Sequence, residues 1–121
     1  MKLNDKVIKI VENNGFFINE VEKQGNDFYV ELGQGTPLGE DWWETIWFDG
    51  TNEGFIEAVR ERYNNFDVDE EAEIWIENRG KNGVPSSIRA LLRDAEWKEA
   101  TLDELATSLE ELELDEEEAE D

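Results

Sequence analysis

The sequence contains neither cysteine nor histidine. Without cysteine the chain can form no disulfide framework and no thiolate nucleophile, which suits a reducing cytoplasm. Without histidine it lacks the commonest general base and the commonest metal ligand, so a serine triad cannot be built. We therefore predict a protein that is not an enzyme and that uses no cofactor.

Long apolar segments are also missing. The longest apolar runs, such as residues 46–48, contain three residues, whereas a membrane-spanning helix needs about 20. The first residues include Lys2, Lys6 and Lys9 but no apolar core of a signal peptide. We expect a cytoplasmic protein that does not bind membranes.

Basic residues are scarce. Eleven Lys and Arg stand against 33 Asp and Glu, which gives a formal net charge of −22. Duplex DNA carries this much charge over about 37 Å of its axis, and a compact chain of 121 residues has a diameter of roughly 35 Å. The protein therefore approaches the charge density of DNA. The charge either serves general solubility or favours a basic protein partner, while repulsion excludes direct binding to nucleic acid.

Apolar residues make up 38% of the chain and aromatic residues 11%, which is sufficient for one folded domain. Periodicity and capping residues predict an α+β domain over residues 1–114. We expect a helix at 4–14, a three-stranded antiparallel sheet formed by 16–23, 28–34 and 42–49, and about four further helices that begin near residues 51, 67, 87 and 101 and pack on the sheet. Residues 115–121 are expected to form a disordered acidic tail, because they offer little to bury.

The third expected strand is apolar on both faces. Alternation places Trp42, Ile46 and Phe48 on one face, and Trp43 and Trp47 on the other. In one interpretation, helices cover this strand on both sides. In the other, Trp43 and Trp47 are exposed aromatic anchors for a partner, as interface hot spots often are.

Acidic residues are concentrated between positions 67 and 73, which hold five of them. Asp67 and Glu70 have the spacing of a capping box, but a helix start needs only one or two acids. Carboxylates can pair with arginines that would otherwise bind phosphates. We therefore predict a partner-binding surface that consists of this segment and acids expected nearby: Asp41, Glu44, Asp49, Asp67, Asp69, Glu70, Glu71 and Glu73.

The same segment has the alternation of a calcium loop. An EF-hand loop that starts at Asp67 would need glycine at its sixth position and glutamate at its twelfth. Those positions hold Ala72 and Asn78. The spacing therefore predicts no metal site.

Two stretches, WWETIWFDGTNEGFIEAVRERYNNFDVDEEAEIWI and GKNGVPSSIRALLRDAEWKEATLDELA, resemble a family of small acidic proteins carried on prophages and other mobile elements of Firmicutes. The resemblance covers roughly residues 25–112 and concerns the whole pattern. The expected order of a helix, three strands, a helix, an acidic turn and a helix is also similar to that of small anti-CRISPR proteins that inhibit Cas9. This chain differs from them in its two further helices and its acidic tail.

The second resemblance implies a DNA mimic whose acidic residues occupy the PAM-reading site of guide-loaded Cas9. The corresponding turn here is residues 67–73. The expected partner is then the basic DNA-binding groove of a nuclease such as Cas9 in a bacterial host cell. Two alternatives stay open: an anti-restriction or general DNA-mimic protein, and an acidic adaptor domain in which Trp43 and Trp47 bind the partner.

Overall fold

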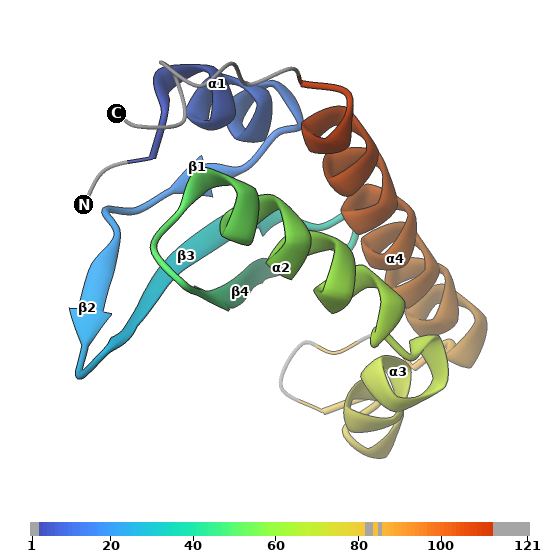
Figure 1. The fold of residues 1–121 in the computed structure, drawn as a ribbon. Helices are drawn as coiled ribbons and strands as arrows, with labels where there is room; N and C mark the ends of the chain where they lie inside the picture. Colours follow the sequence, from blue (N-terminus) through green and yellow to red (C-terminus); the bar gives the residue numbers. More distant parts are fainter. Residues whose placement is uncertain (1–2, 82–83, 85, 113–121) are drawn as a thin grey trace.

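The computed structural model describes residues 3–81, 84 and 86–112 (Figure 1). The fold is α+β, as the sequence predicts. The elements in chain order are α1 (Asp5–Asn13), β1 (Phe17–Ile18), β2 (Glu22–Gln24), β3 (Asp27–Gly35), β4 (Asp41–Phe48), α2 (Asn52–Asn64), α3 (Val68–Glu77) and α4 (Ile88–Glu110). The domain end expected at residue 114 and the tail expected at 115–121 lie outside the described residues.

The sheet is antiparallel, with β3 at its centre. β4 pairs along one edge of β3, while β1 and β2 both pair with β3 and share its other edge. Phe17 pairs with Gly33 whereas Glu22 pairs with Tyr29, so one extra residue lies between β1 and β2 and the register shifts by one. The first strand expected at 16–23 is therefore interrupted, and the described part of the chain has four strands instead of three.

The helices cover one face of the sheet. Figure 1 shows α2 crossing in front of β3 and β4, α4 running beside α2, and α3 packed near one end of α4. Side chains of β4 are alternately exposed and buried along the strand. Trp43 and Trp47 lie on the face of β4 that no helix covers, and they remain 52% and 50% exposed. The interpretation in which helices cover this strand on both sides is therefore wrong.

Local capping explains where the helices start. A side-chain oxygen of each N-cap residue accepts a hydrogen bond from a backbone N–H in the first turn, which satisfies a donor that the helix itself leaves unpaired. These N-cap residues are Asn4, Thr51, Asp67 and Ser87. The sequence predicts Asn4, Asp67 and Ser87 as caps, and for α2 it predicts either Thr51 or Asn52.

The predicted start near 87 is confirmed, but the prediction of a separate helix beginning near 101 is wrong. α4 is one helix of 23 residues. Thr101 lies in its interior, where the hydroxyl donates to the carbonyl of Trp97 at 2.7 Å instead of capping a new helix. The described residues thus contain four helices where five were expected. One apolar stripe runs through both predicted segments and packs into the core: Leu91, Ala95, Leu102, Leu105, Ala106 and Leu109.

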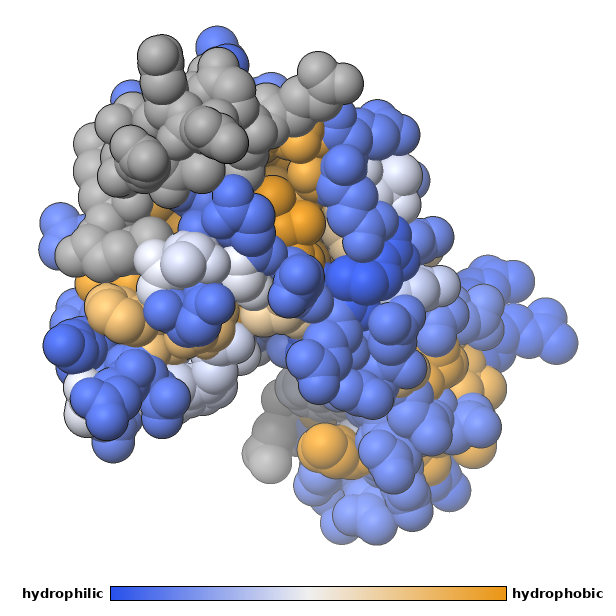
Figure 2. All heavy atoms as spheres, in the orientation of Figure 1, coloured by the Kyte–Doolittle hydropathy of each residue, from blue (hydrophilic) through white to orange (hydrophobic). Residues whose placement is uncertain are grey.

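Hydrophilic residues cover most of the face seen in Figure 2, and hydrophobic residues emerge there in small separate groups. Throughout residues 3–81, 84 and 86–112, no helix has both the length and the apolar character to cross a membrane.

Candidate functional site

The eight predicted carboxylates differ in what they contact. Asp67 precedes α3, and its Oδ1 accepts hydrogen bonds from the backbone N–H groups of Asp69 at 2.9 Å and Glu70 at 3.2 Å. Its carboxylate is therefore engaged in starting the helix. Asp69 and Glu70 occupy the first turn with exposed side chains, where the partial positive charge of the helix N-terminus stabilises them.

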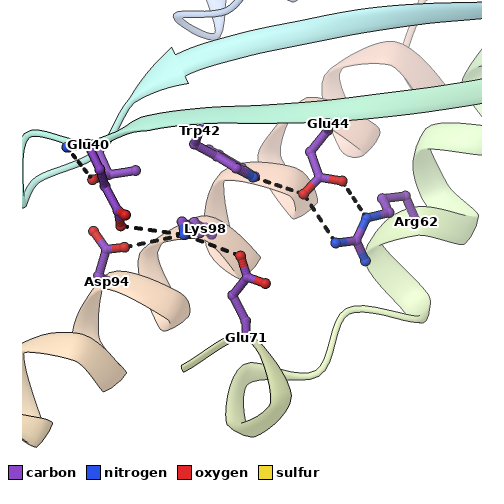
Figure 3. Close-up of polar contacts among 8 residues, drawn as sticks. Glu40, Trp42, Glu44, Arg62, Glu71, Asp94 and Lys98 are labelled. Carbon is purple, nitrogen blue, oxygen red and sulfur yellow. Dashed lines mark hydrogen bonds and ion pairs between the residues drawn. The ribbon is translucent and has the colours of Figure 1, made fainter. Parts of the chain in front are cut away.

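Glu71 points toward α4. Its Oε1 lies 3.2 Å from Nζ of Lys98, a side chain that is only 3% exposed. The same nitrogen lies 3.6 Å from Glu40 and 3.5 Å from Asp94 (Figure 3). We call Glu40, Glu71, Asp94 and Lys98 the Lys98 cluster. It joins the β3–β4 connection, α3 and α4 through one buried cation, so Glu71 has a structural role.

The Lys98 cluster holds three carboxylates for one ammonium group. Burial, followed by the adjacent carboxyl of Asp94, raises the pKa of Glu40 to about 7, while the charge of Lys98 acts in the opposite direction. Oδ1 of Asp94 is buried and has no hydrogen-bond partner among the described residues. A proton on Glu40 is therefore favoured in the folded state and would supply a hydrogen-bond donor to the Asp94 carboxyl.

Glu44 lies on the helix-covered face of β4 and is 9% exposed. One of its oxygens accepts from the indole N–H of Trp42 at 2.8 Å, and the carboxylate takes two hydrogen bonds from Arg62, at 2.6 and 3.1 Å (Figure 3). This side chain is buried inside the domain and binds α2 to β4. The structure therefore does not present Glu44 to a partner.

Asp49 acts in the turn between β4 and α2. Its Oδ1 accepts from the backbone N–H of Thr51 at 2.9 Å and from the Thr51 hydroxyl at 2.6 Å. These hydrogen bonds lower the pKa of Asp49. The carboxylate is exposed, but its role in the structure is to hold the turn.

Four predicted acids keep carboxylates without an ion pair or side-chain hydrogen bond within the described residues, and all four are exposed: Asp41, Asp69, Glu70 and Glu73. Three of them lie on α3. Asp41 lies at the start of β4 and pairs with Gly35. The predicted surface therefore divides between α3 and the sheet.

The open face of the sheet gathers aromatic side chains, of which the sequence predicts only Trp43 and Trp47. Trp43 pairs across the strands with Gly33, and Trp47 with Tyr29. A Cβ atom placed on Gly33 would lie 2.5 Å from the Trp43 ring, so the indole covers this glycine closely. The rings of Tyr29 and Trp47 have centroids 4.7 Å apart. Phe17, opposite Gly33 on β1, is 74% exposed.

Carboxylates flank these rings. Glu31 lies between Tyr29 and Gly33 on β3, and a hollow of about 400 Å³ beside it is lined by Asn19, Glu20, Glu22, Tyr29 and Glu31. No cation of the described chain forms an ion pair with these glutamates. We define the aromatic face as Phe17, Tyr29, Trp43 and Trp47 together with Glu22, Glu31 and Asp41. The alternation of Tyr29 and Glu31 with Val30 and Leu32 was the available sequence signal.

The part of the chain that the structure describes contains no group of three or more carboxylates able to hold a metal ion. Comparison with protein-family models, with curated proteins and with solved structures found no match.

Proposed function

We propose that this protein is a non-enzymatic inhibitor that binds the basic DNA-binding groove of a host-defence nuclease and mimics the charge of DNA, with guide-loaded Cas9 as the first target to test. The observation that carries the proposal is the net charge of −22 of the whole chain, combined with carboxylates of the described domain that no internal cation neutralises. Among the predicted acids, those on α3 are Asp69, Glu70 and Glu73.

The local structure of α3 supports this role. Asp67 caps the helix, and Glu71 pairs with Lys98 of α4. The free acids are therefore fixed on a helix that is already formed, which lowers the entropy lost on binding. Cas9 reads the PAM duplex through a basic site and holds nucleic acid in positively charged channels, so it offers a complementary surface.

A DNA-cleavage assay with Cas9 tests the target. The protein is added before target DNA at low and at moderate salt, with a DNA-binding gel in parallel. We expect cleavage and DNA binding to be lost together, and the inhibition to weaken with salt because opposite charges are screened. Inhibition with DNA binding intact would instead indicate a block on nuclease activation. No inhibition at any salt concentration would exclude Cas9, and restriction enzymes assayed in the same way would test the anti-restriction alternative.

Charge reversal tests the surface. Changing Asp69, Glu70 and Glu73 together to Lys should abolish inhibition without unfolding the domain, because these side chains have no internal partners. Asp67 and Glu71 are left unchanged because both support the fold. The matched control reverses three exposed acids of α2, namely Glu53, Glu57 and Glu61. An equal loss in both variants would show that only net charge matters and would contradict a site on α3.

An acidic adaptor is the second candidate, and the exposure of Trp43 and Trp47 favours it. In that case the tryptophans bind the partner and the charge serves solubility. Binding that persists in high salt would identify the adaptor, because hydrophobic contacts are not screened.

A further inference from the structure

We propose that the aromatic face of the sheet binds arginine side chains of the partner protein. This inference rests on the proposed function in one respect, namely that the partner is a basic protein. It adds a second contact surface, on the opposite side of the sheet from the helices, and it names the chemical group that this surface recognises.

The rings are already held in place for such contacts. Trp43 covers Gly33 so closely that a side chain at position 33 would collide with the indole. Trp47 packs against Tyr29 at 4.7 Å between ring centroids. Both tryptophans nevertheless keep about half of their surface exposed. Each indole is thus restrained from one side and open on the other, which reduces the side-chain entropy that binding would cost.

The position of Glu31 points to a cation with a flat, extended head group. In the strand pairing, Glu31 lies opposite Thr45, between the row of Gly33 and Trp43 and the row of Tyr29 and Trp47. Successive rows on one face lie about 6.6 Å apart. A guanidinium group can pair with a carboxylate and also stack on a neighbouring aromatic ring. A lysine ammonium is a compact, strongly hydrated charge and fits this combination less well.

No basic side chain of the strands competes for this face. Lys23 is the single basic residue in β1–β4. It pairs with Phe28 and places its ammonium nitrogen 5.6 Å from the centre of that ring, on the opposite side of the sheet from Tyr29. The carboxylates of the aromatic face are therefore available to a partner.

Charge also excludes other occupants. Two copies of a chain of net charge −22 repel each other, and the aromatic face itself carries Glu22, Glu31 and Asp41. Nucleic acid is repelled for the same reason. The partner that is complementary in charge to the aromatic face is therefore a protein surface that presents arginine side chains.

The test uses the isotope-labelled full chain and two synthetic peptides of equal length and charge, one of alternating arginine and glycine and one of alternating lysine and glycine. Two-dimensional NMR follows both titrations at moderate salt. We expect the arginine peptide to bind roughly tenfold more tightly, the range that cation–π contacts provide. The largest shifts should occur at the indole N–H groups of Trp43 and Trp47 and at residues 29–31. Equal affinity for the two peptides, or shifts on α3 with none on the aromatic face, would overturn the inference.

Variants test whether the aromatic face causes the preference for the arginine peptide. The double variant Trp43→Ala and Trp47→Ala should lose the preference for arginine. Glu31→Gln keeps the shape of the side chain and should weaken binding of the arginine peptide severalfold. Glu57→Gln on α2 makes the same chemical change at an exposed position outside both proposed surfaces and should leave the preference intact. A preference that survives in the double variant and in Glu31→Gln contradicts the inference.

Nuclease inhibition separates this inference from the proposed function. If the double tryptophan variant inhibits the nuclease as well as the unchanged protein does, the aromatic face takes no part and the inference fails while the function stands. If the protein prefers the arginine peptide but inhibits no nuclease, the proposed function fails, while the inference that the aromatic face binds arginine is upheld.

Discussion

The ammonium nitrogen of Lys98 lies 3.2 Å from a carboxylate oxygen of Glu71 and thereby joins α3 to α4. The same nitrogen lies 5.7 Å from the centre of the Trp75 ring, which is also on α3. An acidic helix in an acidic protein is thus attached through a buried cation. Free acids remain on its exposed side.

Removing that cation should destabilise the domain. Lys98→Met leaves Glu40, Glu71 and Asp94 without a counter-charge, and breaking a buried ion pair in this way costs about 3–5 kcal/mol. The free energy of unfolding from urea denaturation measures the effect. Lys9→Met, at an exposed position of α1, serves as the control and should change stability by less than about 0.5 kcal/mol. Equal stability of the two variants would mean that Lys98 does not hold α3.

The raised pKa of Glu40 should appear in the pH dependence of stability. Between its ordinary pKa of 4.5 and its folded value of about 7, the folded state binds this proton more tightly than the unfolded state does. The free energy of unfolding should therefore fall as pH rises through this interval. Glu40→Gln does not titrate, so its stability should fall less over the same interval.

Urea denaturation at several pH values between about 5 and 8 measures this difference. Glu53→Gln, at an exposed position in the first turn of α2, should keep the steeper pH dependence of the unchanged protein. If Glu40→Gln and the unchanged protein lose stability in parallel, Glu40 is ionised in the folded state throughout this range.

The continuity of α4 makes a further prediction. Thr101→Ala should change stability by less than about 0.7 kcal/mol, because alanine is a better helix former and the hydroxyl only bonds back to Trp97 within the helix. Ser87→Ala removes the true N-cap, whose oxygen accepts from the N–H of Ala90, and should cost about 1 kcal/mol. Chemical denaturation compares the two variants. A loss at Thr101 as large as that at Ser87 would favour two separate helices.

The elements that the sequence predicted correctly depend on neighbouring residues. A cap such as Asp67 needs only a side-chain oxygen and an N–H group two or three residues later, so the pattern is complete within one turn. Strand alternation is local in the same sense, and it placed Trp43 and Trp47 together on one face. The error at Thr101 arose because a threonine three residues before Glu104 has the pattern of a cap. Packing of the leucine stripe on both sides of Thr101 favours one helix instead.

Ion pairing could not be predicted in this way. Glu44 and Arg62 are 18 residues apart, and Glu71 and Lys98 are 27 apart. A carboxylate that will be buried against a distant cation has the same sequence signature as one that will face solvent. For this reason the predicted surface included Glu44 and Glu71, which the fold uses internally.

The sequence by itself determined the net charge, the α+β class and the starts of the four helices, although it also suggested a false start at Thr101. Charge is a sum over residues, and the other two arise from local periodicity and capping. Only the tertiary structure decided which carboxylates are neutralised and which stay free, because that depends on contacts between residues far apart in the chain. It likewise decided that Trp43 and Trp47 of β4 are about half exposed while Trp42 is buried, since a single layer of helices covers only one face of the sheet.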